Sequence, residues 1–355
     1  MNNNNIEFRK LEHLLVCNYC DVEYKKGTLL EDVELIHSGV SNCDLNDIDT
    51  SIELFNKKLD APLMVAAITG GHSKAKEINK NIAIAVEELN LGMGVGSQRA
   101  GILNSDLIDT YSVVRDYTSS LVIGNLGAVN FIEDNWNEET IYKSVDMIDA
   151  DAIALHFNPL QEAIQPEGDV NFKGIGILKD IISNYKNKYG NIPFIAKQVG
   201  EGFSKEDAIL LKNIGFDAID VGGSGGTSWA SVEYYRIKDE NHKKFSERFL
   251  EWGIPTAASI LEVRSVYNKT VIATGGIRSG MDMAKSIVIG ADCCGMALPI
   301  LKAALKNSDE VIKVLEKMIK ELKTVMFLMG CDTISDLKKS RYIIKNELKE
   351  WISKQ

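Results

Sequence analysis

The clearest chemical signal in this 355-residue chain comes from three short segments, two of them rich in glycine, that each follow directly after an apolar run. GGSGGT at 222–227 and GGIRSG at 275–280 follow two such runs, and Ala297 and Leu298 follow the last one. Glycine lets backbone N–H groups come close to a phosphate, and a helix N-terminus attracts an anion. One glycine pair alone would more often be an ordinary turn, but the three loops together predict a phosphate site.

A second segment, HFNPLQEAIQPEGD at 156–169, combines amides and carboxylates with a histidine. It continues directly from an apolar run, and its two prolines stiffen the backbone. Glu162 or Glu167 is a candidate ligand for Mg²⁺, which favours one or two carboxylates together with substrate phosphates. A solvated polar loop is the alternative, although such loops rarely alternate apolar residues with amides directly after a buried strand.

Basic residues stand at three further places. Lys197 ends the apolar run FIAKQ and is either part of a structural ion pair or a cation that faces a bound anion. Arg9 and Lys10 begin the segment RKLEHL, which taken alone is an ordinary helix face, and the dipeptide Gln98-Arg99 ends another apolar run. Because arginine binds phosphate in a bidentate manner, these basic groups together are a candidate clamp for a diphosphate.

The composition limits the partners. A net charge of −10 argues against nucleic acid, because a nucleic-acid surface would be basic, but it does not exclude a small anion. The sequence has no long apolar run and begins MNNNNIEFRK, so we expect no membrane segment, no signal peptide and a cytoplasmic location. The cysteines give no sign of a disulfide framework. The six are scattered along the chain, which indicates reduced thiols. Cys17 and Cys20 have the spacing of zinc ligands, but no second pair accompanies them, which favours ordinary thiols.

From residue 61 onward, apolar runs alternate with amphipathic stretches, which predicts an α/β fold. We expect a closed (β/α)₈ TIM barrel, in which active sites lie at the carboxyl ends of the strands. An open doubly wound sheet is the alternative, but the first strand ends AAITGG and lacks the fingerprint GxGxxG. The expected strands are 61–68, 91–97, 121–126, 151–157, 193–199, 217–222, 270–274 and 291–297.

Three segments lie outside the predicted repeat. They are a polar N-terminal extension at 1–60, C-terminal helices at 305–355, and an insertion at about 227–255. A loop as long as this insertion in a compact barrel is more often a cover over the active site than an idle segment. No linker divides the chain, so we expect residues 1–355 to form one domain.

Several motifs, in their order along the chain, resemble those of the type 2 isopentenyl diphosphate isomerases. They are RKLEHL, PLMVAAITGG, GMGVGSQRA, GNLGA, ALHFNPLQEAIQPEGD, KQVGEG, GGSGGTSW, ATGGIRSG and GMALP. The resemblance extends from residue 9 to about residue 300. Its most specific part is HFNPLQEAIQPEGD, whereas GGxRxG is shared by many FMN barrels.

The resemblance implies an isomerase of isoprenoid biosynthesis that interconverts isopentenyl and dimethylallyl diphosphate by a 1,3-allylic proton shift. It implies a flavoprotein with FMN, Mg²⁺, NADPH as the reductant of the flavin, and a homo-oligomer, either a tetramer or an octamer. We expect reduced FMN to be the acid–base catalyst. A side-chain acid contributes typically ~10²–10⁴-fold, and the predicted rim offers one histidine and few unassigned carboxylates. Lys197 would then stabilise the negative charge of the reduced flavin.

The same resemblance implies roles for individual residues. Glu162 is the expected metal ligand, and Gln161 is expected to orient the substrate or relay a proton, with His156 and Asn158 shaping the catalytic site. The expected substrate contacts are Arg9, Lys10, Ser97, Gln98, Arg99 and Gln161. The expected flavin contacts are Ala67, Ile68, Thr69, Ser97, Asn125, Lys197, Thr227, Gly276, Ile277, Arg278, Ala297 and Leu298.

Two positions depart from the family pattern. Gly222 stands where some members have serine, which would remove one hydroxyl from the flavin phosphate. Gln198 stands where an acidic residue is common. Neither position carries the expected chemistry.

Three rival functions remain at this point. An FMN α-hydroxyacid oxidase needs a histidine base late in the barrel, but His242, inside the insertion, is the only histidine after His156. A dehydrogenase of the inosine-monophosphate type needs a nucleophilic cysteine in a mobile loop, whereas Cys293 and Cys294 lie in the last expected strand. A non-catalytic phosphate or flavin binder needs the glycine loops alone.

Overall fold

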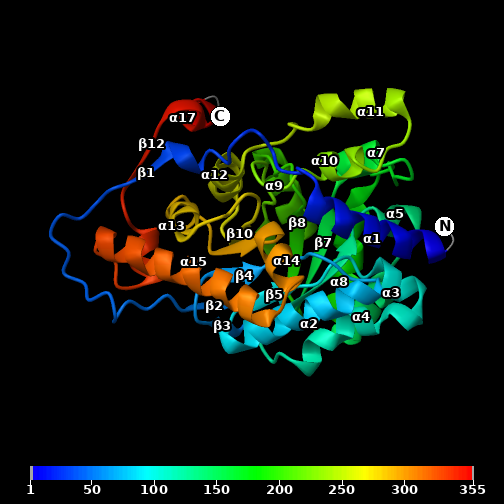
Figure 1. Ribbon diagram of the computed structural model, residues 1–355, viewed down its shortest axis with the longest axis horizontal. Helices are drawn as coiled ribbons and strands as arrows, with labels where there is room; N and C mark the ends of the chain where they lie inside the picture. Colours follow the sequence, from blue (N-terminus) through cyan, green and yellow to red (C-terminus); the bar gives the residue numbers. More distant parts are fainter. Residues whose placement is uncertain (1–2, 354–355) are drawn as a thin grey trace.

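The computed structural model describes residues 3–353, which form a closed barrel of eight parallel strands (Figure 1). Consecutive strands pair with one another, and the last pairs with the first to close the ring. The barrel strands are β4 (Leu63–Val65), β5 (Gly92–Gly94), β6 (Val122–Gly127), β7 (Ala152–Phe157), β8 (Phe194–Gln198), β9 (Ala218–Asp220), β10 (Thr270–Ala273) and β11 (Cys293–Met296). Each overlaps one expected run, so the predicted TIM barrel is confirmed.

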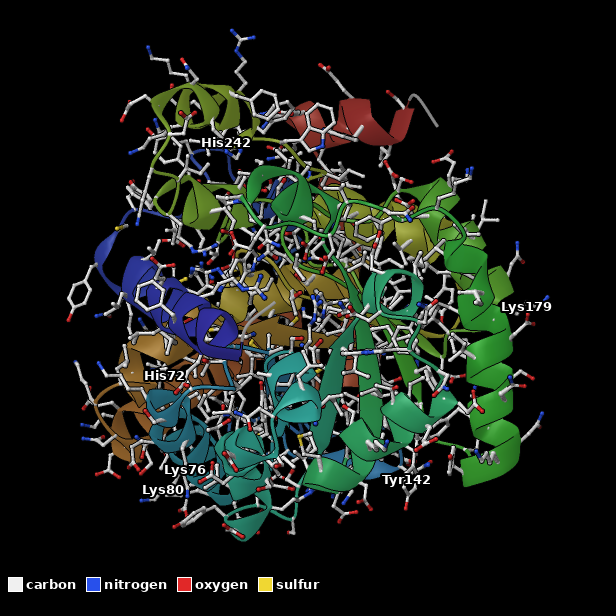
Figure 2. All side chains as sticks on the ribbon, turned by 90° about the vertical axis from the view of Figure 1, so that its right-hand side faces the viewer. His72, Lys76, Lys80, Tyr142, Lys179 and His242 are labelled. Carbon is white, nitrogen blue, oxygen red and sulfur yellow. The ribbon has the colours of Figure 1, made fainter. Side chains whose placement is uncertain are left out.

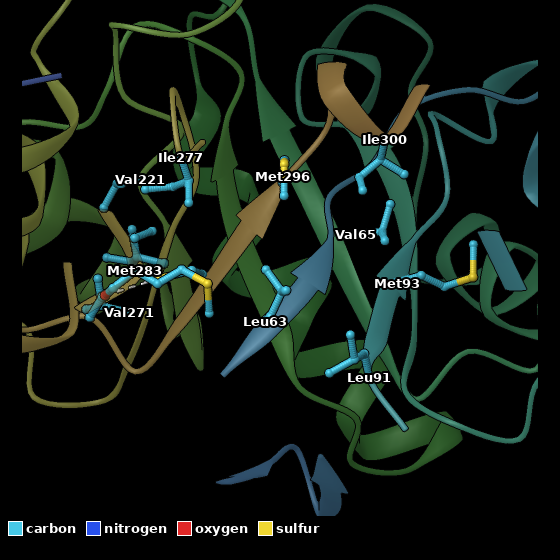
Figure 3. Packing of buried hydrophobic residues seen from close by; sticks show 14 of the residues in the cluster. Leu63, Val65, Leu91, Met93, Val221, Val271, Ile277, Met283, Met296 and Ile300 are labelled. Atoms are coloured by element: carbon cyan, nitrogen blue, oxygen red, sulfur yellow. Dashed lines mark hydrogen bonds between the residues drawn. The ribbon is translucent and has the colours of Figure 1, made fainter. Parts of the chain in front are cut away.

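The strands are mostly apolar, apart from polar residues toward their carboxyl ends, because both of their faces are buried. Successive side chains of a strand point to opposite faces. Leu63 and Val65 of β4 therefore pack outward in one buried cluster with Leu91 and Met93 (Figure 3). Met64, between them, packs in a separate cluster inside the barrel. This pattern explains why continuous apolar runs, rather than alternating ones, marked the strands in the sequence.

Helices surround the barrel, and α2 shows how the sequence specifies them. Ile82 and Val86 recur at helical spacing and are buried. His72, rather than Ser73, is the N-cap of α2, because its ring accepts a hydrogen bond from the backbone N–H of Lys74. The helices that follow successive strands include α2 (Ser73–Glu88), α6 (Glu138–Ile148), α8 (Leu178–Tyr189), α9 (Lys205–Ile214), α12 (Thr256–Val266), α13 (Gly280–Val288) and α15 (Ser308–Met329).

The C-terminal segment, expected at 305–355 outside the repeat, in fact contributes to the barrel. Its helix α15 packs against both α13 and α2, so it completes the surrounding ring of helices. After it come α16 (Ile334–Lys338), the strand β12 (Tyr342–Ile344) and α17 (Asn346–Ser353). β12 pairs antiparallel with β1 (Val33–Leu35), which ties the C-terminal segment to the N-terminal extension.

The N-terminal extension at 1–60 contains more regular structure than its polar composition indicates. It begins with α1 (Asn3–Tyr19) and ends with the hairpin of β2 (Ile52–Leu54) and β3 (Lys57–Leu59). Leu54 and Leu59 are buried in the same cluster as Met64 and other residues inside the barrel. The hairpin therefore covers one end of the barrel and leaves the carboxyl ends of the strands accessible from the other.

The insertion at 227–255 folds into the helices α10 (Trp229–Tyr234) and α11 (Glu240–Ser246). α10 packs against α1 and against α7 (Pro159–Ile164), which follows β7 (Figure 1). The other short helices are α3 (Arg99–Leu103), α4 (Asp109–Ser112), α5 (Asn130–Glu133) and α14 (Leu298–Ala304). Across residues 3–353, no helix has the length and apolar character needed to cross a membrane.

Candidate active site

A cavity at the carboxyl ends of the barrel strands collects most of the residues that the sequence singled out. Those that line it are Arg9, Lys10, Ala67, Ile68, Ser97, Arg99, Asn125, His156, Asn158, Gln161, Glu162, Lys197, Thr227, Gly276, Arg278, Ala297 and Leu298. Three predicted contacts, Thr69, Gln98 and Ile277, are buried and do not line it. The structure thus joins residues of the N-terminal extension to the rim of the barrel.

Gln98 is fully buried and faces the protein interior instead of the cavity. Its side-chain nitrogen donates to the backbone oxygen of Ser144 at 2.8 Å. Its Oε1 accepts from the backbone N–H of Asn125 at 2.9 Å. Gln98 therefore links β6 to α6 and supports Asn125, and its side chain is not placed for the predicted contact with the substrate.

The glycine-rich loops after β9 and β10 pack backbone against backbone. A Cβ atom at Gly226 would lie 2.3 Å from the backbone nitrogen of Gly276, and one at Gly276 would lie 2.6 Å from the carbonyl oxygen of Gly225. Gly276 also has a φ of 72°, which favours glycine. Within residues 3–353, the N–H group of Gly276 has no hydrogen-bond acceptor, and Gly276 lines the cavity. This donor is therefore available to a phosphate.

Lys197, at the end of β8, forms a buried ion pair on the cavity wall. Its Nζ lies 2.7 Å from Oδ2 of Asp220. The other carboxylate oxygen of Asp220 accepts a 2.5 Å hydrogen bond from the hydroxyl of Thr274. The ion pair confirms one of the two interpretations of Lys197. Because Lys197 also lines the cavity, its charge remains next to any ligand bound there.

His156, at the end of β7, is held in one orientation. Its Nδ1 lies 2.8 Å from Oδ1 of Asn125, an oxygen that can only accept, so Nδ1 carries the proton. Burial, together with the nearby charges of Lys10 and Lys197, lowers the pKa of His156 to about 3. His156 is therefore a neutral group at physiological pH and does not serve as a strong acid.

Glu162, in α7, lies beside an amide oxygen that has no partner. Its carboxylate accepts hydrogen bonds from the side chain of Asn158 at 2.8 Å, from the backbone N–H of Asp169 at 2.8 Å and from the side chain of Gln165. Burial raises the pKa of Glu162. Oδ1 of Asn158 is buried without a hydrogen-bond partner.

Carboxylate and amide oxygens are ligands that Mg²⁺ accepts. Among the described residues, no group of three or more His, Cys, Asp or Glu side chains is arranged to hold a metal. A site with Glu162 as its only carboxylate fits an ion that retains several waters and is bound largely through substrate phosphates. Glu167, the other candidate in the sequence, instead forms an ion pair with Arg236 at 2.8 Å.

Three cations, Arg9, Lys10 and Arg99, also line the cavity. Burial and the charges of Arg9 and Arg99 lower the pKa of Lys10 to about 8. Arg99 forms ion pairs with Asp169 at 2.6 Å and Asp134 at 3.0 Å. Among the described residues, Lys10 has no ion-pair partner, and its ammonium group, next to two other cations, favours binding of an anion.

No role was predicted from the sequence for His13 or Glu233, which form a buried pair beside these cations. Nε2 of His13 lies 2.9 Å from Oε1 of Glu233, and the side chain of Gln161 donates to the same oxygen at 3.1 Å. Burial acts to raise the pKa of Glu233, but His13 and Arg236 lower it to about 2. His13 lies on the same face of α1 as Arg9 and Lys10, a signal in the sequence that was overlooked. Glu233, inside the insertion, carried no such signal.

The two positions that depart from the family pattern have structural explanations. Oε1 of Gln198 accepts from the backbone N–H groups of Val199, Gly200 and Glu201, a task that needs an oxygen but no charge. A Cβ atom at Gly222 would lie 2.0 Å from the carbonyl oxygen of Gln198, so this backbone leaves no room for serine.

A closed parallel barrel, with free backbone donors in its late loops and a lysine on the cavity wall, defines a flavin-dependent barrel enzyme. Consistent with this class, residues 179–344 match the family model described as FMN-dependent dehydrogenase. The chain is 77% identical to the isopentenyl-diphosphate delta-isomerase of Methanococcus aeolicus, over 98% of this chain and 99% of that protein. It is 70% identical to the enzyme of the same name from Methanocaldococcus jannaschii, over 100% and 99% of the two chains. The chain belongs to the type 2, FMN-dependent isopentenyl-diphosphate delta-isomerase family.

A solved structure of mandelate oxidase has the same fold. It superposes with a TM-score of 0.63 at 19% identity, covering 94% of this chain and 90% of that one. His242, the only histidine that could have served as a late oxidase base, lies on α11 at the periphery (Figure 2) and does not line the cavity. Cys293 and Cys294 are buried within β11. The residues that the rival enzymes require are therefore not in the cavity.

The residues present fit FMN. Backbone donors of the loops after β9 and β10 suit a terminal phosphate, and the glycines leave no room for side chains in these loops. Arg278 lines the same region, with its guanidinium paired to Glu23 at 2.5 Å. Lys197 supplies a fixed positive charge further along the cavity.

Proposed function

We propose that this isomerase interconverts isopentenyl and dimethylallyl diphosphate by a 1,3-allylic proton shift, as a step in isoprenoid biosynthesis. The observation that carries this function is the composition of a single cavity. Its lining combines residues of the glycine loops and Lys197 with the cations Arg9, Lys10 and Arg99. A flavin and a small diphosphate would thus be held against each other.

Bound FMN in its reduced form supplies a group that can accept and donate a proton. The protein's part is to hold that form, and Lys197 is the residue placed to do so, since a cation stabilises the negative charge of a reduced flavin. The carboxylate of Asp220 at 2.7 Å keeps the ammonium group of Lys197 in place. The backbone N–H group of Gly276, in the glycine loop after β10, would bind the phosphate.

Arg9, Lys10 and Arg99 would bind the diphosphate of the substrate, since all three cations line the cavity. Arg9 and Lys10 approach from α1. Glu162, with Oδ1 of Asn158 beside it, would place Mg²⁺ against the same phosphates. The hydrocarbon part of the substrate then lies toward the neutral part of the cavity.

The side chains near the reacting carbons are poorly suited to protonate an alkene. His156 is neutral with a pKa of about 3, and the low pKa of Glu233 keeps that carboxylate ionised. Gln161 is an amide held by Glu233, so it orients the substrate. These states support assigning the acid–base role to the reduced cofactor. NADPH as the reductant, a cytoplasmic location and a homotetramer or homo-octamer belong to the same proposal.

The identity of the cofactor is tested on the protein as purified. We expect denaturation to release one flavin that chromatography identifies as FMN, because the glycine loops provide for a single terminal phosphate. Mixing the reduced enzyme with isopentenyl diphosphate should then yield dimethylallyl diphosphate. Recovery of FAD, or turnover of lactate instead of isopentenyl diphosphate, would refute this function.

A further inference from the structure

Arg236, in the turn after α10, binds carboxylates from three separate segments. Its Nε lies 3.0 Å from Glu12 of α1, and its Nη2 lies 2.8 Å from Glu167, which follows α7. Its Nη1 contacts Glu233 of α10. The side chain of Arg236 is only 8% exposed. A planar guanidinium has donors on each of its edges, so it can join three carboxylates where an ammonium group has no matching geometry.

Each of these three segments carries or contacts a residue of the part of the cavity that would bind the substrate, here called the substrate wall and made of Arg9, Lys10, Gln161 and Glu162. Glu12 lies on α1 within one turn of Arg9. Glu167 follows α7, which holds Glu162. Glu233 accepts the hydrogen bond from Gln161. Figure 1 shows α1, α7 and α10 close together at one side of the molecule, and α10 contacts the other two.

Arg236 also competes with Arg9 for the carboxylate of Glu167. One oxygen of Glu167 lies 2.8 Å from Arg236 and 3.8 Å from Arg9. Because Arg236 holds Glu167 at the shorter distance, Arg9 has only a weak competing partner. Without Arg236, Arg9 would be drawn to Glu167, and Glu12 and Glu233 would add negative charge beside the diphosphate.

We propose that Arg236 is a positioning residue of the isomerase. It fixes α1, α7 and α10 around the substrate wall and neutralises Glu167, so that Arg9 is available to the diphosphate. This inference rests on the proposed function, because it names the diphosphate as the anion that Arg9 binds. FMN binding should depend little on Arg236, since the glycine loops that would hold the cofactor phosphate belong to other segments.

The test uses the holoenzyme reduced with dithionite and compares wild type with Arg236→Met, Arg236→Lys and Arg248→Met. Arg248 is exposed in the same insertion and serves as the control. We expect Arg236→Met to raise KM for isopentenyl diphosphate about tenfold or more, because the buried carboxylates lose the cation that neutralises them. The KM of Arg236→Lys should be intermediate. The Kd of both Arg236 variants for FMN, measured by flavin fluorescence, should stay close to the wild-type value. Arg248→Met should match wild type in KM for isopentenyl diphosphate and in Kd for FMN.

A second variant separates positioning from general stability. Adding Glu167→Gln to Arg236→Met removes the carboxylate that would capture Arg9, so KM should recover in part. A role in folding alone would couple the two changes in the free energy of unfolding, because Arg236 and Glu167 are in contact, but it would give no such recovery of KM.

An unchanged KM in Arg236→Met, an equal loss of FMN affinity, or no recovery in the double variant would overturn the inference. If Arg236→Met does not fold, Glu12→Gln takes its place. A raised KM with unchanged FMN affinity supports the inference, and an unchanged KM overturns it. A wild-type enzyme that binds FMN but does not turn over isopentenyl diphosphate would instead reject the proposed function.

Discussion

At the scale of single residues, Glu162 carries the most specific expectation. Glu162→Gln keeps the size of the side chain and removes its charge. We expect turnover at saturating Mg²⁺ to fall by about 100-fold, since a bound metal contributes several kcal/mol to charge stabilisation. FMN should remain bound, because the glycine loops are untouched. Activity titrated against Mg²⁺ concentration, together with the flavin spectrum, measures both effects.

Glu167→Gln is the matched control for this change. Glu167 is held by Arg236 at 2.8 Å, so the Mg²⁺ dependence of the enzyme should not change in that variant. A Glu162→Gln enzyme with the same Mg²⁺ dependence as wild type would remove Glu162 from the metal site. A large loss of stability with unchanged turnover would show that its hydrogen bonds to Asn158 and Asp169 are its main role.

Glu201, in the loop after β8, predicts a pH dependence of stability. Neither of its carboxylate oxygens has a hydrogen-bond partner within residues 3–353, and burial raises its pKa from 4.5 to about 7. The folded protein therefore holds this proton more tightly than the unfolded chain. The resulting stabilisation is fully present below about pH 4.5 and is lost as the pH rises through about 7.

The glutamine in Glu201→Gln is neutral at every pH, so this variant should become more stable relative to wild type as the pH rises from 5 to 8. The difference in the free energy of unfolding should grow by roughly 3 kcal/mol, because one pKa unit corresponds to about 1.4 kcal/mol. Urea unfolding at several pH values measures it. Glu206→Gln, on the exposed face of α9, is the control. A pH-independent difference for Glu201→Gln would show that its carboxyl ionises normally.

Prediction of individual residues from the sequence depended on whether their partners lie nearby in the chain. Asn158 and Glu162 lie within one motif and contact each other, so the motif located both. His13 and Glu233 are 220 residues apart, and no local pattern marks such a contact. Gln98 lies in a motif at the rim, but the motif does not reveal which way its side chain turns.

At the scale of elements, α1 is the part whose role is easiest to test. Leu14 and Cys17 dock this helix through its buried face, whereas Arg9 and Lys10 face the cavity. Replacing both cations with alanine should therefore raise KM for isopentenyl diphosphate about tenfold or more, since 1.4 kcal/mol of lost binding is tenfold. The melting temperature should change little. Steady-state kinetics and thermal unfolding measure the two quantities. A large loss of stability at unchanged KM would show that Arg9 and Lys10 have a structural role instead.

The elements of the barrel could be predicted because each strand is buried on both faces and gives an unbroken apolar run. The polar extension at 1–60 gave no such signal, since its three short strands are only partly buried and therefore carry polar residues. The pairing of β1 with β12 joins segments about 300 residues apart and lies beyond any local pattern. For the same reason, α15 was not recognised as part of the ring.

At the scale of the whole molecule, the closed barrel brings residues from the first turns of the chain and from its last strands to one cavity. Arg9 and Leu298 both line it, although nearly the whole chain separates them. The order of the barrel strands follows the order of the sequence, so the fold class was predictable from the alternation of elements alone. The placement of α1 on that cavity was expected only from the family resemblance, because it depends on contacts with α3, α10 and α14, which lie far from α1 in the sequence.

The central claim is that the reduced flavin acts as acid and base without net redox change. Its most direct test is a count of turnovers against NADPH consumed by anaerobic enzyme. We expect oxidised enzyme to be inactive and to gain full activity once the flavin is reduced. Many molecules of dimethylallyl diphosphate should then form for each NADPH used, and the flavin spectrum should remain that of the reduced form. Full activity in enzyme held oxidised, or one NADPH consumed per product, would contradict the claim.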